Sequence, residues 1–242
     1  MIRCVFLSIN PALISGLTPV ESFGLIFIFL TMVFALSDEI VFPDPSLADE
    51  DGLLAMGGDL SRERLLKGYQ RGIFPWFSEG DPICWFAPHE RCVIFPERIK
   101  LSKSMRKVMK DGIFKVTMNQ AYEQVIRNCA EIVREGQDGT WITDDMQKAY
   151  IDLHKGGWAH SVEVWYGAEL AGGLYGVMVN GVFCGESMFS LMSNASKTAL
   201  IWLCQCGDFR LIDCQMPNDH LMSLGAEMIP REEYLMLLQL KR

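Results

Sequence analysis

After residue 157 the apolar residues of the chain change from helical spacing to strand-like spacing. The run HSVEVWYGAELAGGLYGVMVNGVFCGESMFS at 160–190 is typical of three strands, and Asn180-Gly181 is a strong signal for a two-residue hairpin turn. A helix over 194–206 and a strand over 211–215 should follow, before a helix at 218–226, a short strand and a last helix. Consecutive strands followed by alternating helices and strands predict an α/β (α+β) domain built on a mixed sheet.

The part of the chain before residue 157 is predicted to consist of helices joined by irregular stretches. Ser61 can cap a helix over 61–72, which Gly72 can end. Residues 73–91 are so rich in proline and aromatic residues that we expect rigid irregular structure there. The remaining expectations are a turn-rich acidic lead-in at 42–60, strand pieces at 92–101 broken at Pro96, and helices at 102–110, 119–133 and 144–157.

The composition favours a globular protein with reduced cysteines. Half of the 242 residues are hydrophobic and 21% are charged, which permits a substantial core. The eight cysteines form no CxxC pair, and none of the four histidines lies near a cysteine at zinc-ligand spacing. We therefore expect buried thiols in a cytosolic protein, and no metal site. The net charge of −8 argues against a surface coated with nucleic acid, unless basic residues cluster locally.

An apolar run of fourteen residues, FGLIFIFLTMVFAL at 23–36, precedes the globular part. It is short for a membrane span, which needs about 18 or more apolar residues. A signal peptide would start with a short basic segment, whereas a long segment precedes this run and Glu21 lies beside it. The third interpretation, which we favour, is that translation starts at Met32 and that residues 1–31 are a mis-annotated extension.

Two polar residues interrupt the strand LIDCQ. Asp213 and Gln215 lie two positions apart, so their side chains should project from the same face. Glu186 ends the last strand of the meander, on the face shared by Val182 and Cys184. If the two strands are neighbours, Glu186, Asp213 and Gln215 converge. The alternative is that these are ordinary polar residues of a sheet, paired with backbone groups or with an arginine.

A basic helix stands out in this acidic protein. From Arg98 to Lys110 there are six basic residues and no acidic one. At helical spacing four of them share a face, namely Lys103, Arg106, Lys107 and Lys110. This face could follow a phosphate backbone, or it could be a solvated helix surface. A similar choice, between base stacking and core packing, applies to the aromatic residues Trp76, Phe77, Trp85, Phe86 and Trp141.

Seven motifs occur in a fixed order: GLLAMGGDLSRERLLKGYQRGIFPWFSEGDPICWFAPHER, DGTWIT, AHSVEVW, GGLYGV, FCGESMFS, NASKTAL and LIDCQ…HLMSLGAEMIPR. In order and spacing they resemble the bacterial leucyl/phenylalanyl-tRNA–protein transferase family, from Phe42 to Tyr234. The resemblance implies a small N-terminal domain followed by an acetyltransferase-like (GNAT-like) mixed-sheet domain.

The resemblance also implies an activity. Leucine or phenylalanine would pass from leucyl-tRNA or phenylalanyl-tRNA to the α-amine of a cytoplasmic protein that begins with arginine or lysine. This addition would mark the product for degradation by the N-degron pathway. The aminoacyl ester is already activated, so the reaction needs no cofactor, no ATP and no metal. The attacking α-amine has a pKa of about 7.7–8.0, so a weak hydrogen-bond acceptor is enough to orient it.

Roles for individual residues follow from the same resemblance. Gln215 is expected to position the α-amine and accept its proton, with Asp213 orienting Gln215. Glu186 is expected to attract the cationic side chain or the ammonium group of the acceptor. The basic face of Lys103, Arg106, Lys107 and Lys110 corresponds to the tRNA-contacting patch. Trp76 and Trp141 would line the region that receives the 3′ adenosine and the aminoacyl group, and the walls of the apolar pocket would be Leu174, Phe183, Leu200 and Leu203.

The expected domain division is an apolar extension at 1–36, a small N-terminal domain at 37–95 and a catalytic domain at 96–242. Family members reach the FPDP element soon after their start, which is the reason for favouring Met32. The chain departs from the family at Ala87, where serine is usual, and in a shorter connection before LIDCQ. Neither departure falls within the polar cluster.

Three alternative functions remain. A peptidoglycan-bridge aminoacyltransferase uses the same kind of donor, but it normally has a duplicated domain and a longer chain. A coenzyme A acetyltransferase would need the [QR]xxGx[GA] pyrophosphate signature, which this sequence lacks, as it lacks GxSxG and a glycine-rich phosphate loop. The non-enzyme alternative is a tRNA-binding protein without catalytic activity.

Overall fold

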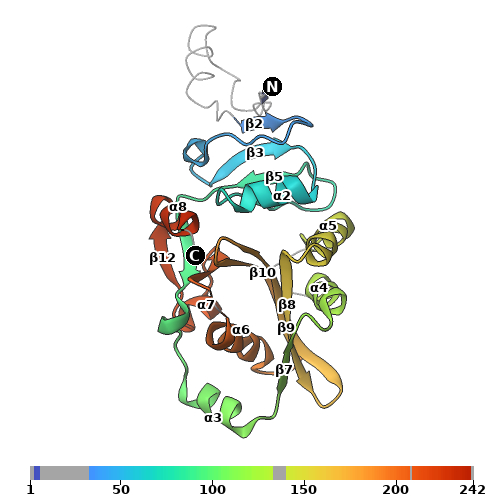
Figure 1. Cartoon of the computed structure of the whole chain (residues 1–242), viewed down its shortest axis with the longest axis vertical. Coiled ribbons are helices and arrows are strands. Elements are labelled where there is room, and N and C mark those ends of the chain that lie inside the picture. The colour runs from blue at the N-terminus through green and yellow to red at the C-terminus, as the bar shows by residue number, and fades with distance from the viewer. Residues whose placement is uncertain (1–2, 6–32, 133–139, 208, 241–242) are drawn as a thin grey trace, which may run out of the picture.

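The computed structural model describes residues 3–5, 33–132, 140–207 and 209–240. Met32 and most of the apolar run before it lie outside the described residues, so the expected translation start is not addressed by the structure. In Figure 1 a small N-terminal sheet lies at one end of the long axis, and a larger sheet with its helices forms the rest.

The larger layer is a seven-stranded mixed sheet in the order β12-β6-β11-β10-β9-β8-β7. The three strands expected between 160 and 190 are present and pair antiparallel as a meander: β8 (Ala159–Tyr166), β9 (Glu169–Val179) and β10 (Val182–Ser190). The expected strand β11 (Leu211–Gln215) pairs parallel to β10. The antiparallel strands that complete the sheet are β7 (Lys115–Met118), β6 (Glu90–Ile94) and β12 (Glu227–Pro230). The prediction of a mixed sheet is confirmed.

Helices cover both faces of this sheet (Figure 1). On one face lie α4 (Tyr122–Glu131) and α5 (Asp144–Lys155), whose Val125 and Leu153 are fully buried. On the other face lies α6 (Ala195–Cys206), which buries Ala199 and Leu203. The remaining helices of this part are α3 (Lys103–Asp111), α7 (Asp219–Ser223) and α8 (Arg231–Gln239), with a short 3-10 turn η3 (Pro96–Arg98). The succession β7-α4-α5-β8-β9-β10-α6-β11-α7-β12, with its parallel β10–β11 step, is the acetyltransferase-like arrangement that the motifs implied.

The small N-terminal sheet has the order β1-β2-β3-β5-β4. Its elements are β1 (Arg3–Val5), β2 (Val33–Leu36), the 3-10 turn η2 (Pro45–Leu47), β3 (Leu53–Gly57), α2 (Arg62–Tyr69), β4 (Phe74–Pro75) and β5 (Cys84–Phe86). Helix α2 begins as expected at Ser61, whose side chain accepts the backbone N–H of Arg64. The segment 73–91 is not wholly irregular. Two short strands form within it because Trp85 is fully buried and donates its indole N–H to a backbone carbonyl of β3 at 2.9 Å.

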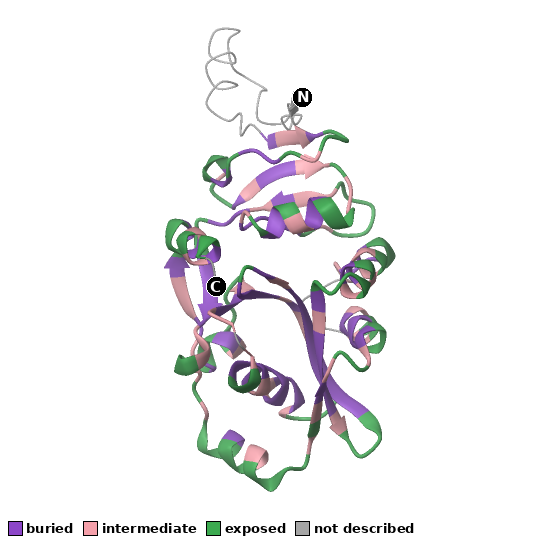
Figure 2. Cartoon of the chain, viewed as in Figure 1, coloured by how far each residue is buried: buried purple, intermediate pink, exposed green. Residues whose placement is uncertain are grey.

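The two sheets share one hydrophobic core. Leu54 and Trp85 of the small sheet belong to the same buried cluster as Val177 and Leu211 of the large sheet. Figure 2 shows the central strands buried and α3 exposed over most of its surface. The division at residue 95 stays a prediction, and strand β6, just before that point, pairs within the large sheet.

Candidate active site

A cavity of about 1380 Å³ opens between the small sheet and the strands β10 and β11. It arises because β10 and β11 pair only from Val182 to Cys184 and from Leu211 to Asp213, and diverge beyond. Ligands of α/β sheets commonly bind where neighbouring strands separate. Each of the six side chains expected to contact substrate lines this cavity: Trp76, Trp141, Leu174, Phe183, Leu200 and Leu203.

Two backbone irregularities place polar side chains at this opening. A bulge in β10 between Gly185 and Ser187 leaves Glu186 outside the regular ladder. A second bulge, in β11 opposite β6, makes Cys214 an extra residue, and Gln215 has a φ of +61°. A non-glycine residue in this left-handed region costs about 1 kcal/mol or more, and such residues cluster at functional sites. Glu186 and Gln215 both line the cavity.

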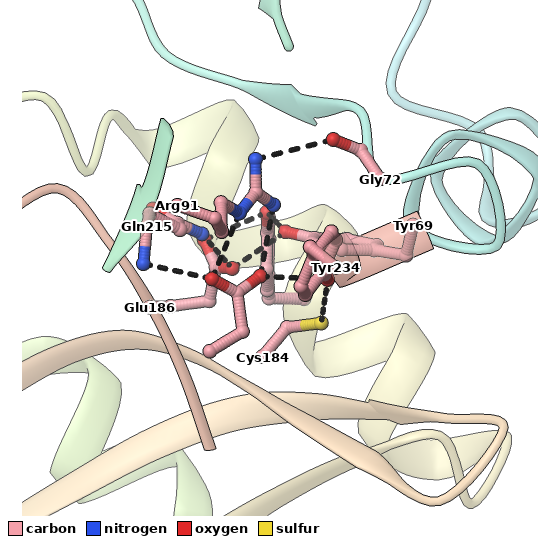
Figure 3. Close-up of polar contacts among 9 residues, drawn as sticks. Tyr69, Gly72, Arg91, Cys184, Glu186, Gln215 and Tyr234 are labelled. Atoms are coloured by element: carbon pink, nitrogen blue, oxygen red, sulfur yellow. Dashed lines mark hydrogen bonds and ion pairs between the residues drawn. The ribbon is translucent and has the colours of Figure 1, made fainter. Parts of the chain in front are cut away.

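Glu186 accepts three side-chain hydrogen bonds (Figure 3). Its Oε1 accepts the hydroxyl of Tyr69 at 2.7 Å and the Nε2–H of Gln215 at 2.9 Å. Its Oε2 accepts the hydroxyl of Tyr150 at 3.1 Å, and the two tyrosine hydroxyl oxygens, each with its proton directed at Glu186, lie next to each other. Burial raises the pKa of Glu186 to about 7, because the loss of solvation outweighs these hydrogen bonds. The Glu186 carboxyl therefore titrates close to neutral pH.

This shift predicts a pH-dependent stability. The folded state binds the Glu186 proton more tightly than the unfolded chain, whose glutamate has a pKa of 4.5. The stabilisation is fully present below pH 4.5 and is lost as the pH rises through about 7. When the pH is raised from about 5 to 8, the unfolding free energy of the wild type should fall by up to about 3 kcal/mol more than that of Glu186→Gln. Urea unfolding at both pH values measures this, with exposed Glu123→Gln as the control. Equal pH slopes for wild type and Glu186→Gln would contradict the assignment.

Asp213 lies behind Gln215 in a fully buried ion pair. Its two carboxylate oxygens accept the Nε–H and the Nη2–H of Arg91, each at 2.8 Å. Oδ1 also accepts the backbone N–H of Gln215 at 2.8 Å, and Oδ2 accepts the hydroxyl of Tyr234 at 2.9 Å. Burial opposes the charge on Arg91, yet the Asp213 carboxylate raises the pKa of the guanidinium above its usual value. The rings of Phe74 and Tyr234 lie 4.6 and 4.7 Å from that guanidinium.

The structure thus brings Glu186, Gln215 and Asp213 together, as was predicted for the case in which their strands are neighbours. The three side chains differ, however, in whether they line the cavity. Glu186 and Gln215 line the cavity, whereas the Asp213 side chain is enclosed by Arg91 and Tyr234 and is not among the lining residues. Pairing of Asp213 with an arginine was the alternative interpretation, and it holds. Asp213 contacts the backbone N–H of Gln215 and does not itself face the cavity.

Sequence reasoning missed the partners of this cluster. Arg91 carried one usable signal, since it is a charged residue directly before the buried run CVI of a strand. Tyr69, Tyr150 and Tyr234 were indistinguishable from the apolar faces of their helices. Among the aromatic residues for which base stacking and core packing were both considered, Trp85 is part of the core, whereas Trp76 lines the cavity and is 45% exposed.

The basic face lies elsewhere. Helix α3 is at the end of the molecule away from the small sheet in Figure 1. Its four basic side chains are exposed, namely Lys103, Arg106, Lys107 and Lys110. Lys107 pairs with Asp111 at 2.5 Å. On the opposite face of the helix Met105 is buried. The helix is therefore amphipathic as expected, and its basic face does not form part of the cavity lining.

Within residues 3–5, 33–132, 140–207 and 209–240, no group of three or more His, Cys, Asp or Glu could hold a metal ion. No helix in that part of the chain is long and apolar enough to cross a membrane.

The mixed sheet and the cavity where β10 and β11 separate define an α/β protein with a candidate ligand site at its sheet. Residues 93–239 match the family model described as "Leucyl/phenylalanyl-tRNA protein transferase", and residues 58–89 match the model of its N-terminal domain. A leucyl/phenylalanyl-tRNA–protein transferase of Flavobacterium johnsoniae is 53% identical over 212 residues, which is 86% of this chain and 100% of that protein. One of Syntrophus aciditrophicus is 55% identical over 207 residues, 84% of this chain and 87% of its own. The chain belongs to the leucyl/phenylalanyl-tRNA–protein transferase family, and it is an aminoacyltransferase.

Proposed function

We propose that this protein acts in the cytoplasm and transfers leucine or phenylalanine from aminoacyl-tRNA to the α-amine of proteins that begin with arginine or lysine. The modified protein is thereby marked for N-degron degradation. The proposal rests on one observation: a single cavity is lined both by an apolar wall and by a pair of polar side chains. The wall is formed by Leu174, Phe183, Leu200 and Leu203, and the pair is Glu186 and Gln215.

The polar pair suits attack by an amine on an ester. Gln215 donates its Nε2–H to Glu186, so its amide oxygen is the atom that can accept a hydrogen from the incoming α-amine. The nitrogen lone pair attacks the ester carbonyl carbon, the new C–N bond forms, and the C–O bond to the ribose breaks. The proton lost by the amine ends on the departing ribose oxygen. Gln215 holds the nucleophile in line, which is the main contribution of a weak acceptor.

The remaining side chains fit the two substrates. An ionised Glu186 attracts the cationic acceptor, and its pKa of about 7 keeps a useful ionised fraction at neutral pH. The apolar wall selects leucyl and phenylalanyl groups by shape, at about 1–3 kcal/mol per methylene. Trp76 and Trp141 offer ring faces on which the 3′ adenosine can stack.

A direct assay tests the activity. The protein is incubated with phenylalanyl-tRNA or leucyl-tRNA and a peptide that begins with arginine, and the product is identified by mass spectrometry. We expect one amino acid to be added to the free peptide and none to the same peptide with an acetylated α-amine. Binding of charged tRNA without any transfer would instead support a tRNA-binding protein, and transfer only to a branched peptidoglycan peptide would support the bridge-forming alternative.

The donor tRNA should also contact the basic face of α3. Replacing Lys103, Arg106, Lys107 and Lys110 by alanine should flatten the dependence of log K on log salt by about 0.7–0.9 unit for each phosphate that the variant no longer binds. Filter binding of charged tRNA over a salt series measures the slope. Lys148→Ala on α5 is the control, because Lys148 is as exposed as Lys107 and is likewise paired with an aspartate, but it lies outside the basic face. A slope that does not change in the fourfold variant would place the tRNA on another surface.

A further inference from the structure

Two cysteines face each other directly behind the strained residue of the cavity. Cys92 of β6 pairs in register with Gln215 of β11, and Cys214 is the extra residue of the bulge. The two thiols are close enough to perturb each other's ionisation, and both are free. Cys92 and Cys214 also pack against the same hydrophobic cluster, so they lie on the same face of the sheet. Neighbouring strands hold Cα atoms at separations that a disulfide can bridge.

Only one of the two cysteines can be reached from the cavity. Cys214 lines the cavity, whereas Cys92 has no exposed surface. A small reagent entering the cavity therefore meets the Cys214 sulfur first. Cys92, enclosed behind it in the neighbouring strand, is the thiol placed to attack an oxidised Cys214.

We propose that Cys92 and Cys214 form a redox modification site whose oxidising substrate is a small hydroperoxide. Hydrogen peroxide transfers one oxygen to Cys214, which gives a sulfenic acid and water. The Cys92 thiolate then attacks that sulfur, the S–O bond breaks, and the leaving hydroxide takes up the Cys92 proton as a second water. The product is the Cys92–Cys214 disulfide. Two thiols lose two electrons and two protons, and one peroxide becomes two waters.

The disulfide would act on the catalytic geometry. It draws the two sulfurs to about 2.05 Å, which is much closer than two non-bonded sulfur atoms approach. Cys214 stands between Asp213 and Gln215, and Gln215 is held by its N–H bond to Asp213 at a φ of +61°. Movement of Cys214 toward β6 therefore shifts Gln215. A displacement of about 1 Å at the reacting centre can cost about 10²-fold in rate. This effect on transfer rests on the proposed role of Gln215, whereas formation of the disulfide does not.

The experiment treats the full chain with graded hydrogen peroxide and follows two readouts. Mass spectrometry after alkylation reports the disulfide as a Cys92–Cys214 linked peptide lacking two hydrogens. The transfer rate is measured in parallel, before and after dithiothreitol. We expect the linked peptide to accumulate as the rate falls by about 10²-fold, and both to revert on reduction. Cys206→Ser is the control, since Cys206 is a free and exposed thiol that does not line the cavity. It should behave as the wild type does.

Cys92→Ser should form no linked peptide, and peroxide should leave Cys214 as a sulfenic acid, which dithiothreitol reduces, or as the further oxidised sulfinic acid, which it does not. Cys92→Ala serves the same purpose if serine is not tolerated at this buried position. The proposal is wrong if peroxide leaves both wild-type thiols open to alkylation. It is equally wrong if the disulfide forms while transfer continues at the untreated rate. If untreated protein shows no transfer at all, the proposed function fails, and the linked peptide still decides the redox site.

Discussion

Replacing Asp213 by alanine should destabilise the protein by about 3–5 kcal/mol. The substitution leaves the guanidinium of Arg91 buried without its anion, since both carboxylate oxygens of Asp213 bind Arg91 at 2.8 Å and both residues are at most 1% exposed. A buried charge that loses its partner costs far more than the intact pair contributes. Urea unfolding of the wild type and Asp213→Ala at one pH measures the difference.

A second ion pair provides a matched control. Arg62 and Asp152 have the same bidentate geometry, at 2.9 and 2.7 Å, but their side chains are 44% and 54% exposed. Asp152→Ala should therefore cost far less, because solvent screens the exposed pair. The double variant Arg91→Met/Asp213→Leu should be more stable than Asp213→Ala alone, because it removes both charges. Similar losses for Asp213→Ala and Asp152→Ala would show that burial of the pair contributes nothing.

The elements with a regular period were predictable from the sequence. The alternation over 160–190 and the Asn180-Gly181 turn predicted the meander, and Ser61 predicted the start of α2. Cavity side chains such as Leu174 and Leu203 were identified through the family motifs rather than through spacing.

What escaped prediction depends on long-range packing. Arg91 and Asp213 are 122 positions apart, and Tyr69 and Glu186 are 117 apart, so no local pattern links them. The left-handed backbone of Gln215 follows from the bulge opposite β6, which only the paired strands define. The short strand β5 forms around the burial of Trp85, and a run rich in proline and aromatics does not reveal that burial.

Gln215→Ala should slow aminoacyl transfer by up to about 10²-fold, the lower end for a positioned proton acceptor. The substitution removes the amide oxygen that orients the attacking amine and the Nε2–H that Glu186 accepts at 2.9 Å. Affinity for charged tRNA should stay nearly unchanged, because the amide oxygen of Gln215 acts on the acceptor amine at the reacting centre. The apolar wall, which includes Phe183 and Leu200, is left intact.

Single-turnover transfer separates this role from a purely structural one. The enzyme is saturated with phenylalanyl-tRNA, a peptide that begins with arginine is titrated, and the rate of the bound complex is compared between the wild type and Gln215→Ala. If Gln215 positions the amine, the variant reaches a plateau up to about 10²-fold lower at an unchanged tRNA affinity. A wild-type plateau across the whole titration would contradict the account and would leave Glu186 and Gln215 as structural partners of the fold.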